Sequence, residues 1–346
     1  MKSSFWRPFD LISSRLCRDR YSQLYQQQLI QHLKTESAPL LINMRDSTEL
    51  RDLLWQLLGH IPDAGEEPSG VLIESITHVG FRQEEWVLKL NGEQDVPATL
   101  LIPEGVNSAS PAPAIVYNHA HGSRYHIGRK EILEGRPALL EPHWGNVLCE
   151  MGIVVLCIDM WAFGGRASQS ESALFKRMIW TGQVLWGRMV YDNVRALDWL
   201  ENLDFIDPQR IGTMGISLGS TMAWWHAALD DRIKLCIDIC CLTEFNTLVE
   251  NGDMDGHAIY YYVPDLLLHT TSAEINALIA PRMHLSCAGL QDILTPPKGL
   301  DIIDNHLKEV YAEMGAQNSW HLYREDVGHL ETAGMRAKCI EWLRRL

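Results

Sequence analysis

The chain has 346 residues, enough to bury a large core in one big domain or in two of ordinary size. Its residues are 46% hydrophobic and 21% charged, which is the composition of an ordinary globular protein. The formal net charge of −14 argues against a surface that binds nucleic acid or an anionic membrane.

Residues 1–68 are rich in Gln, Leu and charged side chains, and their leucines recur at helical spacing. We therefore predict an N-terminal helical extension, including a helix in 45–62 that begins near Ser47 and ends before Pro62. The acidic, Pro- and Gly-containing stretch 62–70 is typical of a linker. The apolar helical faces could pack on the rest of the chain or on a second subunit, so a homodimer is one option.

The hydrophobic period changes after the linker, and residues 69–346 form the predicted second domain. Three strand-like runs come first, "VLIESITHVG", "EEWVLKL" and "VPATLLIP". Asn91 and Gly92 stand between the second and third runs and predict a hairpin turn. These three runs are expected to form an antiparallel edge of a larger sheet.

Short, fully apolar runs then alternate with segments of helical length. Continuous hydrophobicity indicates strands that are buried on both faces, and the alternation indicates a mostly parallel central sheet with helices on both faces, an α/β fold. The predicted strands are 113–119, 153–160, 210–215, 234–240, 282–287 and 320–325, and the predicted helices are 136–151, 183–203, 218–229, 296–315 and 334–346.

One connection is longer than a crossover helix requires. About forty residues, 241–281, separate two successive strands. Long segments of this kind are often functional, so we predict a lid-like insert over the edge of the sheet.

The stretch "GISLG" places Ser217 between Gly215 and Gly219. A strand precedes it and a helix follows it, which is the layout of a nucleophile elbow. Such a turn strains the serine backbone and presents its hydroxyl at a helix N-terminus, where negative charge is stabilised. The backbone N–H of Leu218 would then donate to an oxyanion.

A serine nucleophile needs a base, and the base needs an orienting acid. Asp292 follows the strand 282–287, and His329 follows the strand 320–325. Both lie at the carboxyl ends of strands, where parallel sheets carry their sites. Asp238 is the rival acid, but "CIDIC" places it inside a strand. Ser217, Asp292 and His329 are therefore the predicted catalytic residues.

The run "YNHAHGSRYH" follows the strand 113–119, where these folds supply the second oxyanion donor. We predict the backbone N–H of His121 for this role. His119, His121 and His126 could also suggest a metal site, but no carboxylate stands at a matching offset. Neither a metal nor another cofactor is expected.

Residues 71–346 resemble an α/β-hydrolase of the dienelactone hydrolase and acetyl xylan esterase-like group. The resemblance rests on "NHAHG", "IDMWAFGGR", "GISLG", "GLQDILTPP" and "VGHLE". It places the nucleophile at Ser217, the acid at Asp292 and the base at His329. Many members carry His-Gly first where this chain reads His-Ala-His-Gly. Dienelactone hydrolases use a cysteine nucleophile, so the serine here indicates ester hydrolysis.

The expected substrate is a small ester, with Trp161, Arg124 and Tyr261 as candidate substrate-binding residues. The first twenty residues lack the apolar core of a signal peptide, and no run is long enough for a membrane helix. Eight scattered cysteines without a CxxC pair predict reduced thiols and a cytoplasmic protein.

The sequence thus predicts a serine hydrolase of carboxylic esters that works through an acyl-enzyme. A peptidase or thioesterase would use the same three residues. A non-catalytic binding or assembly protein with this fold is the third hypothesis.

Overall fold

The computed structural model describes residues 47–62 and 66–346. The predictions for residues 1–46 lie outside the described residues. The helix predicted in 45–62 is present as α2 (Ser47–Leu57), and Gly59 follows it in a left-handed conformation with a φ of +83°. Its buried leucines Leu50 and Leu54, and Leu58 just after its end, join the main hydrophobic core.

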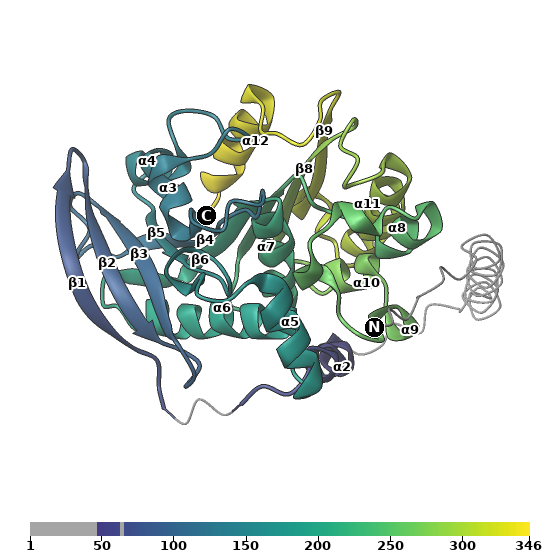
Figure 1. Ribbon diagram of the computed structural model, residues 1–346. Helices are drawn as coiled ribbons and strands as arrows, with labels where there is room; N and C mark the ends of the chain where they lie inside the picture. The colour runs from purple at the N-terminus through teal and green to yellow at the C-terminus, as the bar shows by residue number, and fades with distance from the viewer. Residues whose placement is uncertain (1–46, 63–65) are drawn as a thin grey trace, which may run out of the picture. The chain divides into compact units, whose positions relative to one another are not determined.

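A nine-stranded sheet forms the centre of the described part (Figure 1). Its strand order is β1-β2-β3-β5-β4-β6-β7-β8-β9. The strands β1, β2, β3 and β5 pair antiparallel, and all pairs from β5 to β9 are parallel. The strands are β1 (Ser69–His78), β2 (Phe81–Lys89), β3 (Asp95–Pro103), β4 (Ala112–Asn118), β5 (Val154–Ile158), β6 (Ile206–Ile216), β7 (Leu235–Ile239), β8 (Met283–Gly289) and β9 (Trp320–Glu325).

The antiparallel edge and the parallel centre confirm the predicted sheet. The hairpin predicted at Asn91 and Gly92 joins β2 to β3, with Lys89 opposite Asp95. The strand β6 begins four residues earlier than predicted, because Ile206 already pairs with Ala112 before a register shift. The parallel strands β4, β5, β7 and β8 are almost wholly buried, as their continuous apolar runs required.

Helices cover both faces of the sheet, and two separate hydrophobic cores result. Side chains of α2, α6, α7, α10 and α11 fill one core, and those of α3, α4 and α12 fill the other. Figure 1 shows α3, α4 and α12 together along the upper side of the sheet and α6 along the lower side. The longer helices are α5 (Glu171–Trp180), α6 (Leu185–Glu201), α7 (Leu218–Leu229), α11 (Pro297–Glu313) and α12 (Ala333–Leu343).

One predicted helix was wrong in its bounds, and two helices were not predicted. The predicted helix 136–151 is only α4 (Trp144–Glu150), because Pro142 lacks the N–H that a helix interior requires. The short helix α3 (Glu131–Glu134) precedes it and was not predicted. The helix α5 was not predicted either.

The insert 241–281 consists of short helices and single turns. Its elements are α8 (Phe245–Asn251), the 3₁₀ turns η3 (Met254–Gly256) and η4 (Ile259–Tyr261), α9 (Leu266–His269) and α10 (Ser272–Ala277). The insert is therefore ordered as a chain of single turns and short helices, which lets its side chains reach the loops after β4, β6 and β8.

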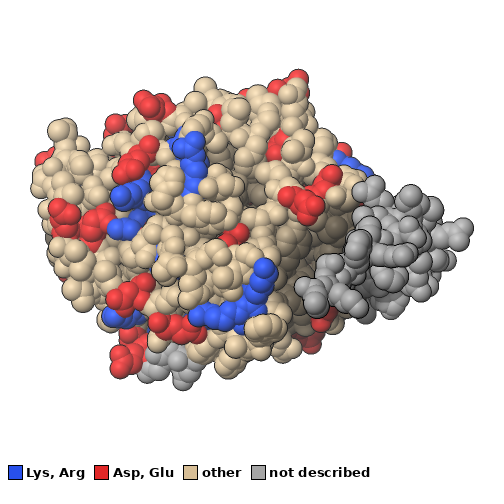
Figure 2. Space-filling view, in the orientation of Figure 1, with Lys and Arg blue, Asp and Glu red and all other residues tan. Residues whose placement is uncertain are grey.

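Charged side chains are scattered over the face shown in Figure 2, where Lys and Arg lie among Asp and Glu without a continuous basic patch. The seven cysteines of the described part are all buried and free. Within residues 47–62 and 66–346, no helix combines the length and the hydropathy needed to cross a membrane.

Candidate active site

Ser217 occupies a sharp turn between β6 and α7. Its backbone has a φ of +60° and a ψ of −119°, a conformation that is rare for residues other than glycine. The Ser217 N–H donates a hydrogen bond of 2.9 Å to the Ile239 carbonyl at the end of the neighbouring strand β7. The strained serine is thus held where strand and helix meet, in the layout predicted for a nucleophile elbow.

The two flanking glycines allow this close approach. A Cβ on Gly219 would lie 1.9 Å from the carbonyl oxygen of Asn118, the last residue of β4. A Cβ on Gly215 would lie 2.6 Å from the backbone of Gly219. Any larger residue would therefore push α7 away from the sheet.

The acid and the base meet across two loops. Asp292 follows β8, His329 follows β9, and the His329 Nδ1 lies 2.6 Å from the Asp292 Oδ2. The other oxygen of this carboxylate accepts the Leu294 N–H at 3.0 Å. Because a carboxylate can only accept, the imidazole proton sits on Nδ1, which leaves Nε2 free to act as a base. The Asp292 side chain is fully buried, whereas 28% of the His329 side chain is exposed.

Ser217 and His329 line the same cavity, which has a volume of about 290 Å³. His121 lines it from the loop after β4. The structure therefore brings the predicted nucleophile, base and oxyanion loop together, with Asp292 directly behind His329.

The predicted oxyanion donors lie at the ends of β4 and β6. Leu218 is the first residue of α7, and the first N–H groups of a helix have no partner within it. The His121 ring is held at both nitrogens: its Nδ1 accepts the Ser123 N–H at 3.0 Å, and its Nε2 lies 3.3 Å from the Glu171 carboxylate. These contacts fix the loop that carries the His121 backbone.

Glu171 is a supporting residue that the sequence did not reveal. It belongs to α5, it is buried, and it also accepts a hydrogen bond from the Tyr125 hydroxyl at 3.2 Å. Burial, reinforced by this carboxylate, raises the pKa of Tyr125 to about 12, so the hydroxyl stays protonated and donates. The helix α5 is thereby tied to the His121 loop.

None of the three predicted substrate-binding residues lines the cavity. Trp161 is fully buried under the guanidinium of Arg166, which lies 4.4 Å from the ring centroid. Arg124 is exposed on the surface. Tyr261 turns its ring against Phe245 instead. Both tyrosines lie in the single turn η4, but their rings are at 86° to each other, and Tyr260 is the one that lines the cavity.

Several cavity residues were missed because they come from the insert or from the loop after β8. Their types carry no motif, and the only signal was the length and the aromatic content of the segment. Burial raises the pKa of the Cys241 thiol to about 11, so this neighbour of Ser217 is a protonated thiol at neutral pH. The missed lining residues are Cys241, Asp255, Gly256, His257, Ala258 and Leu294.

His119 makes a hydrogen bond that leaves its Nε2 without a lone pair for a metal ion. Its Nε2 accepts the Met160 N–H at 3.1 Å, so this lone pair is occupied. Burial lowers the pKa of His119 to about 4 and keeps the ring neutral. The ring links the loop after β4 to the loop after β5.

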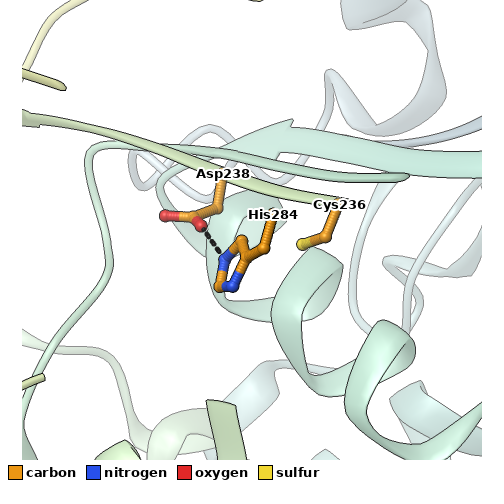
Figure 3. Close-up of side chains that lie close together, drawn as sticks. All are labelled: Cys236, Asp238 and His284. Carbon is orange, nitrogen blue, oxygen red and sulfur yellow. Dashed lines mark hydrogen bonds and ion pairs between the residues drawn. The ribbon is translucent and has the colours of Figure 1, made fainter. Parts of the chain in front are cut away.

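A second buried His–Asp pair lies within the sheet (Figure 3). Asp238 on β7 accepts hydrogen bonds from the His284 Nε2 at 2.7 Å and from the Ser286 hydroxyl at 2.7 Å. Ser220, one turn after the nucleophile, donates to the same carboxylate at 3.4 Å. Asp238, the rival acid, is therefore paired with His284 and not with His329.

Cys236 stands beside this pair, and the three residues offer ligand atoms within 4.8 Å of one another. A closed zinc site takes four protein ligands, usually cysteines and histidines. The Asp238 carboxylate already accepts three hydrogen bonds, and burial raises the pKa of the Cys236 thiol well above its usual range. We interpret the cluster as a buried polar network that ties β7, β8 and α7 together.

The Asp238→Ala substitution is expected to lower the free energy of unfolding by about 3–5 kcal/mol, because it leaves buried polar partners unpaired. The matched control is Asp301→Ala, which removes an exposed ion pair to Arg324 and should cost less than about 1 kcal/mol. Urea unfolding measures both. A loss in Asp238→Ala as small as that of the control would show that the network contributes little.

Sequence comparisons identify relatives of this chain. Residues 166–264 match the acetyl xylan esterase (AXE1) family. YtaP of Bacillus subtilis (strain 168), which carries the name of a hydrolase, is 41% identical over 301 residues that cover 86% of this chain and 98% of YtaP. This chain belongs to the YtaP family of hydrolases. Its described part has the α/β-hydrolase fold.

Solved structures match the fold at low sequence identity. An acetyl xylan esterase from Paenibacillus sp. R4 has a TM-score of 0.60 at 20% identity, and the match covers 89% of this chain and 96% of the esterase. A glucuronoyl esterase from Solibacter usitatus has a TM-score of 0.62 at 14% identity, and the match covers 88% of this chain and 92% of the esterase. These structures show the fold, and the family match together with the hydrolase relative confirms the predicted kinship with acetyl xylan esterases and the class of carboxylic ester hydrolase. The kinship with dienelactone hydrolases stays a prediction.

Proposed function

We propose that this protein is a serine esterase that cleaves small carboxylic esters through an acyl-enzyme. One observation carries the proposal: Ser217 and His329 line one cavity, and His329 is oriented from behind by Asp292 at 2.6 Å. The match to the acetyl xylan esterase family makes acetyl esters the first substrates to test.

The first half of the reaction forms the acyl-enzyme. The His329 Nε2 takes the proton from the Ser217 hydroxyl as its oxygen attacks the ester carbonyl. The Leu218 and His121 N–H groups hold the negative charge that develops on the carbonyl oxygen. His329 then gives the proton to the leaving alcohol oxygen, and the alcohol departs.

The second half releases the acid. Water gives a proton to His329 and attacks the acyl-enzyme carbonyl, and the same N–H groups hold the oxyanion. Collapse of this intermediate breaks the bond to the Ser217 oxygen, which takes its proton back from His329. Asp292 stays ionised throughout and stabilises the imidazolium of each half-reaction.

A fluorophosphonate probe tests the assignment directly, because it reacts with activated serines. We expect one covalent adduct per chain, located by peptide mass spectrometry at Ser217, and loss of p-nitrophenyl acetate hydrolysis in proportion to labelling. A panel with a thioester and a peptide substrate tests the two other bonds that such a triad can cleave. Absence of labelling, or labelling at another serine, would contradict the proposal.

Two further expectations remain proposals. A cytoplasmic location is supported by the free, buried cysteines of the described part. A homodimer rests on the apolar helical spacing of the N-terminal leucines alone.

A further inference from the structure

His257 is a histidine in the cavity that the proposed mechanism does not use. It lies in the insert between η3 and η4 and lines the same cavity as Ser217 and His329. Its ring stacks on Tyr261, with the centroids 4.2 Å apart and the planes at 13°. The imidazole is therefore held in one orientation in the cavity wall.

Its hydrogen bonding determines which nitrogen carries the proton. The Nε2 lies 3.0 Å from the carbonyl oxygen of Leu294. A carbonyl can only accept, so Nε2 carries the hydrogen and Nδ1 keeps its lone pair. Within residues 47–62 and 66–346, no hydrogen bond to this Nδ1 occurs. His257 thus offers a fixed acceptor that has no partner among the described residues.

The ring is also neutral at neutral pH. Burial lowers the pKa of His257, and the nearby His329 lowers it further, whereas the Leu294 carbonyl and Asp292 act in the opposite direction. The net shift is downward, so Nδ1 stays an acceptor under the conditions in which His329 works as a base.

The position of His257 indicates which part of the substrate it meets. Its partner Leu294 follows Asp292 by two residues, so His257 stands on the side of the cavity where the acid and the base lie. His329 must deliver its proton to the leaving oxygen, so the alcohol part of the ester departs on this side. The predicted oxyanion donors Leu218 and His121 come from other elements, the start of α7 and the loop after β4.

The charges of the side chains that line the cavity favour an ester whose alcohol part is uncharged and bears hydroxyl groups. Asp255 adds a second acceptor at the mouth of the cavity, where its side chain is exposed. Among the described residues that line the cavity, none is Lys or Arg. Hydroxyl donors would be satisfied here, whereas an anionic alcohol part would meet no counter-charge.

We propose that His257 is a specificity residue whose Nδ1 accepts a hydrogen bond from a free hydroxyl on the alcohol part of the ester. This inference rests on the proposed esterase function. A substrate with a hydroxyl next to the ester oxygen gains this bond, and one without it leaves the acceptor unpaired.

A pair of esters that differ by one hydroxyl tests the proposal: trans-2-hydroxycyclohexyl acetate and cyclohexyl acetate. The measured quantity is the ratio of their kcat/KM values. We expect the wild-type protein to favour the hydroxylated ester about tenfold, the usual effect of one such hydrogen bond. The His257→Phe variant keeps an aromatic ring against Tyr261 but lacks the acceptor, so its ratio should fall to about one.

Two further variants make the result specific. His257→Asn places an amide oxygen near the Nδ1 position and should restore part of the preference. His78→Phe makes the same change on the exposed strand β1 and should keep the wild-type ratio. Circular dichroism verifies that each variant is folded.

The outcomes separate this inference from the proposed function. If the wild-type protein hydrolyses both esters without preference, or if His257→Phe keeps the tenfold ratio, the role of His257 is wrong while the esterase function stands. If the wild-type protein hydrolyses neither ester nor p-nitrophenyl acetate, the proposed function itself fails.

Discussion

Replacing Ser217 by alanine is expected to lower kcat/KM for p-nitrophenyl acetate by roughly 10⁴-fold or more. Without the hydroxyl no acyl-enzyme forms, and only the oxyanion donors and the cavity remain to assist water. The Ser217 side chain makes no capping hydrogen bond to α7, so the midpoint of thermal unfolding should change little.

The matched control is Ser75→Ala on the exposed strand β1, which should retain wild-type activity and stability. A fluorophosphonate probe should label this control and the wild-type protein but not Ser217→Ala. Turnover by Ser217→Ala above a tenth of the wild-type rate would remove Ser217 from the proposed mechanism.

The second large effect is expected at Asp292. The Asp292→Asn substitution keeps the size of the side chain but removes its charge, and the amide favours the wrong tautomer of His329. We expect kcat to fall by roughly 10³- to 10⁴-fold with little change in KM, because the acid stabilises the imidazolium that forms during the reaction. Steady-state kinetics with p-nitrophenyl acetate measure both quantities.

Asp238 provides the comparison for this second experiment. Both aspartates are buried and both pair with a histidine, but of the two only Asp292 pairs with a histidine that lines the cavity. Asp292→Asn should therefore act mainly on kcat, and Asp238→Ala mainly on the free energy of unfolding. A loss of less than tenfold in Asp292→Asn would mean that another group orients His329.

The insert decides the shape of the cavity. Its residues Asp255–Ala258 and Tyr260 form one wall, and the Tyr260 ring stacks against His121 at a centroid distance of 5.6 Å. The insert thereby contacts the oxyanion loop, and its side chains limit what can reach Ser217. Relatives that share the sheet and differ in this segment would present a different wall.

The sequence by itself determined the elements that depend on local patterns. A buried strand, a glycine-flanked serine and a following helix are read within about twenty residues, so Ser217 and its turn were predictable. Asp292 and His329 were predictable because each follows an apolar strand, and parallel strands bring their carboxyl ends to one edge.

Only the tertiary structure decided which side chains face the cavity. Tyr260 and Tyr261 are adjacent and chemically alike, and packing against His121 or Phe245 separates them. His257 acquires its fixed acceptor through the Leu294 carbonyl, 37 residues away in the chain. Such contacts depend on how the insert folds back over the sheet, and no periodicity or motif within the insert records which face of each short turn is buried.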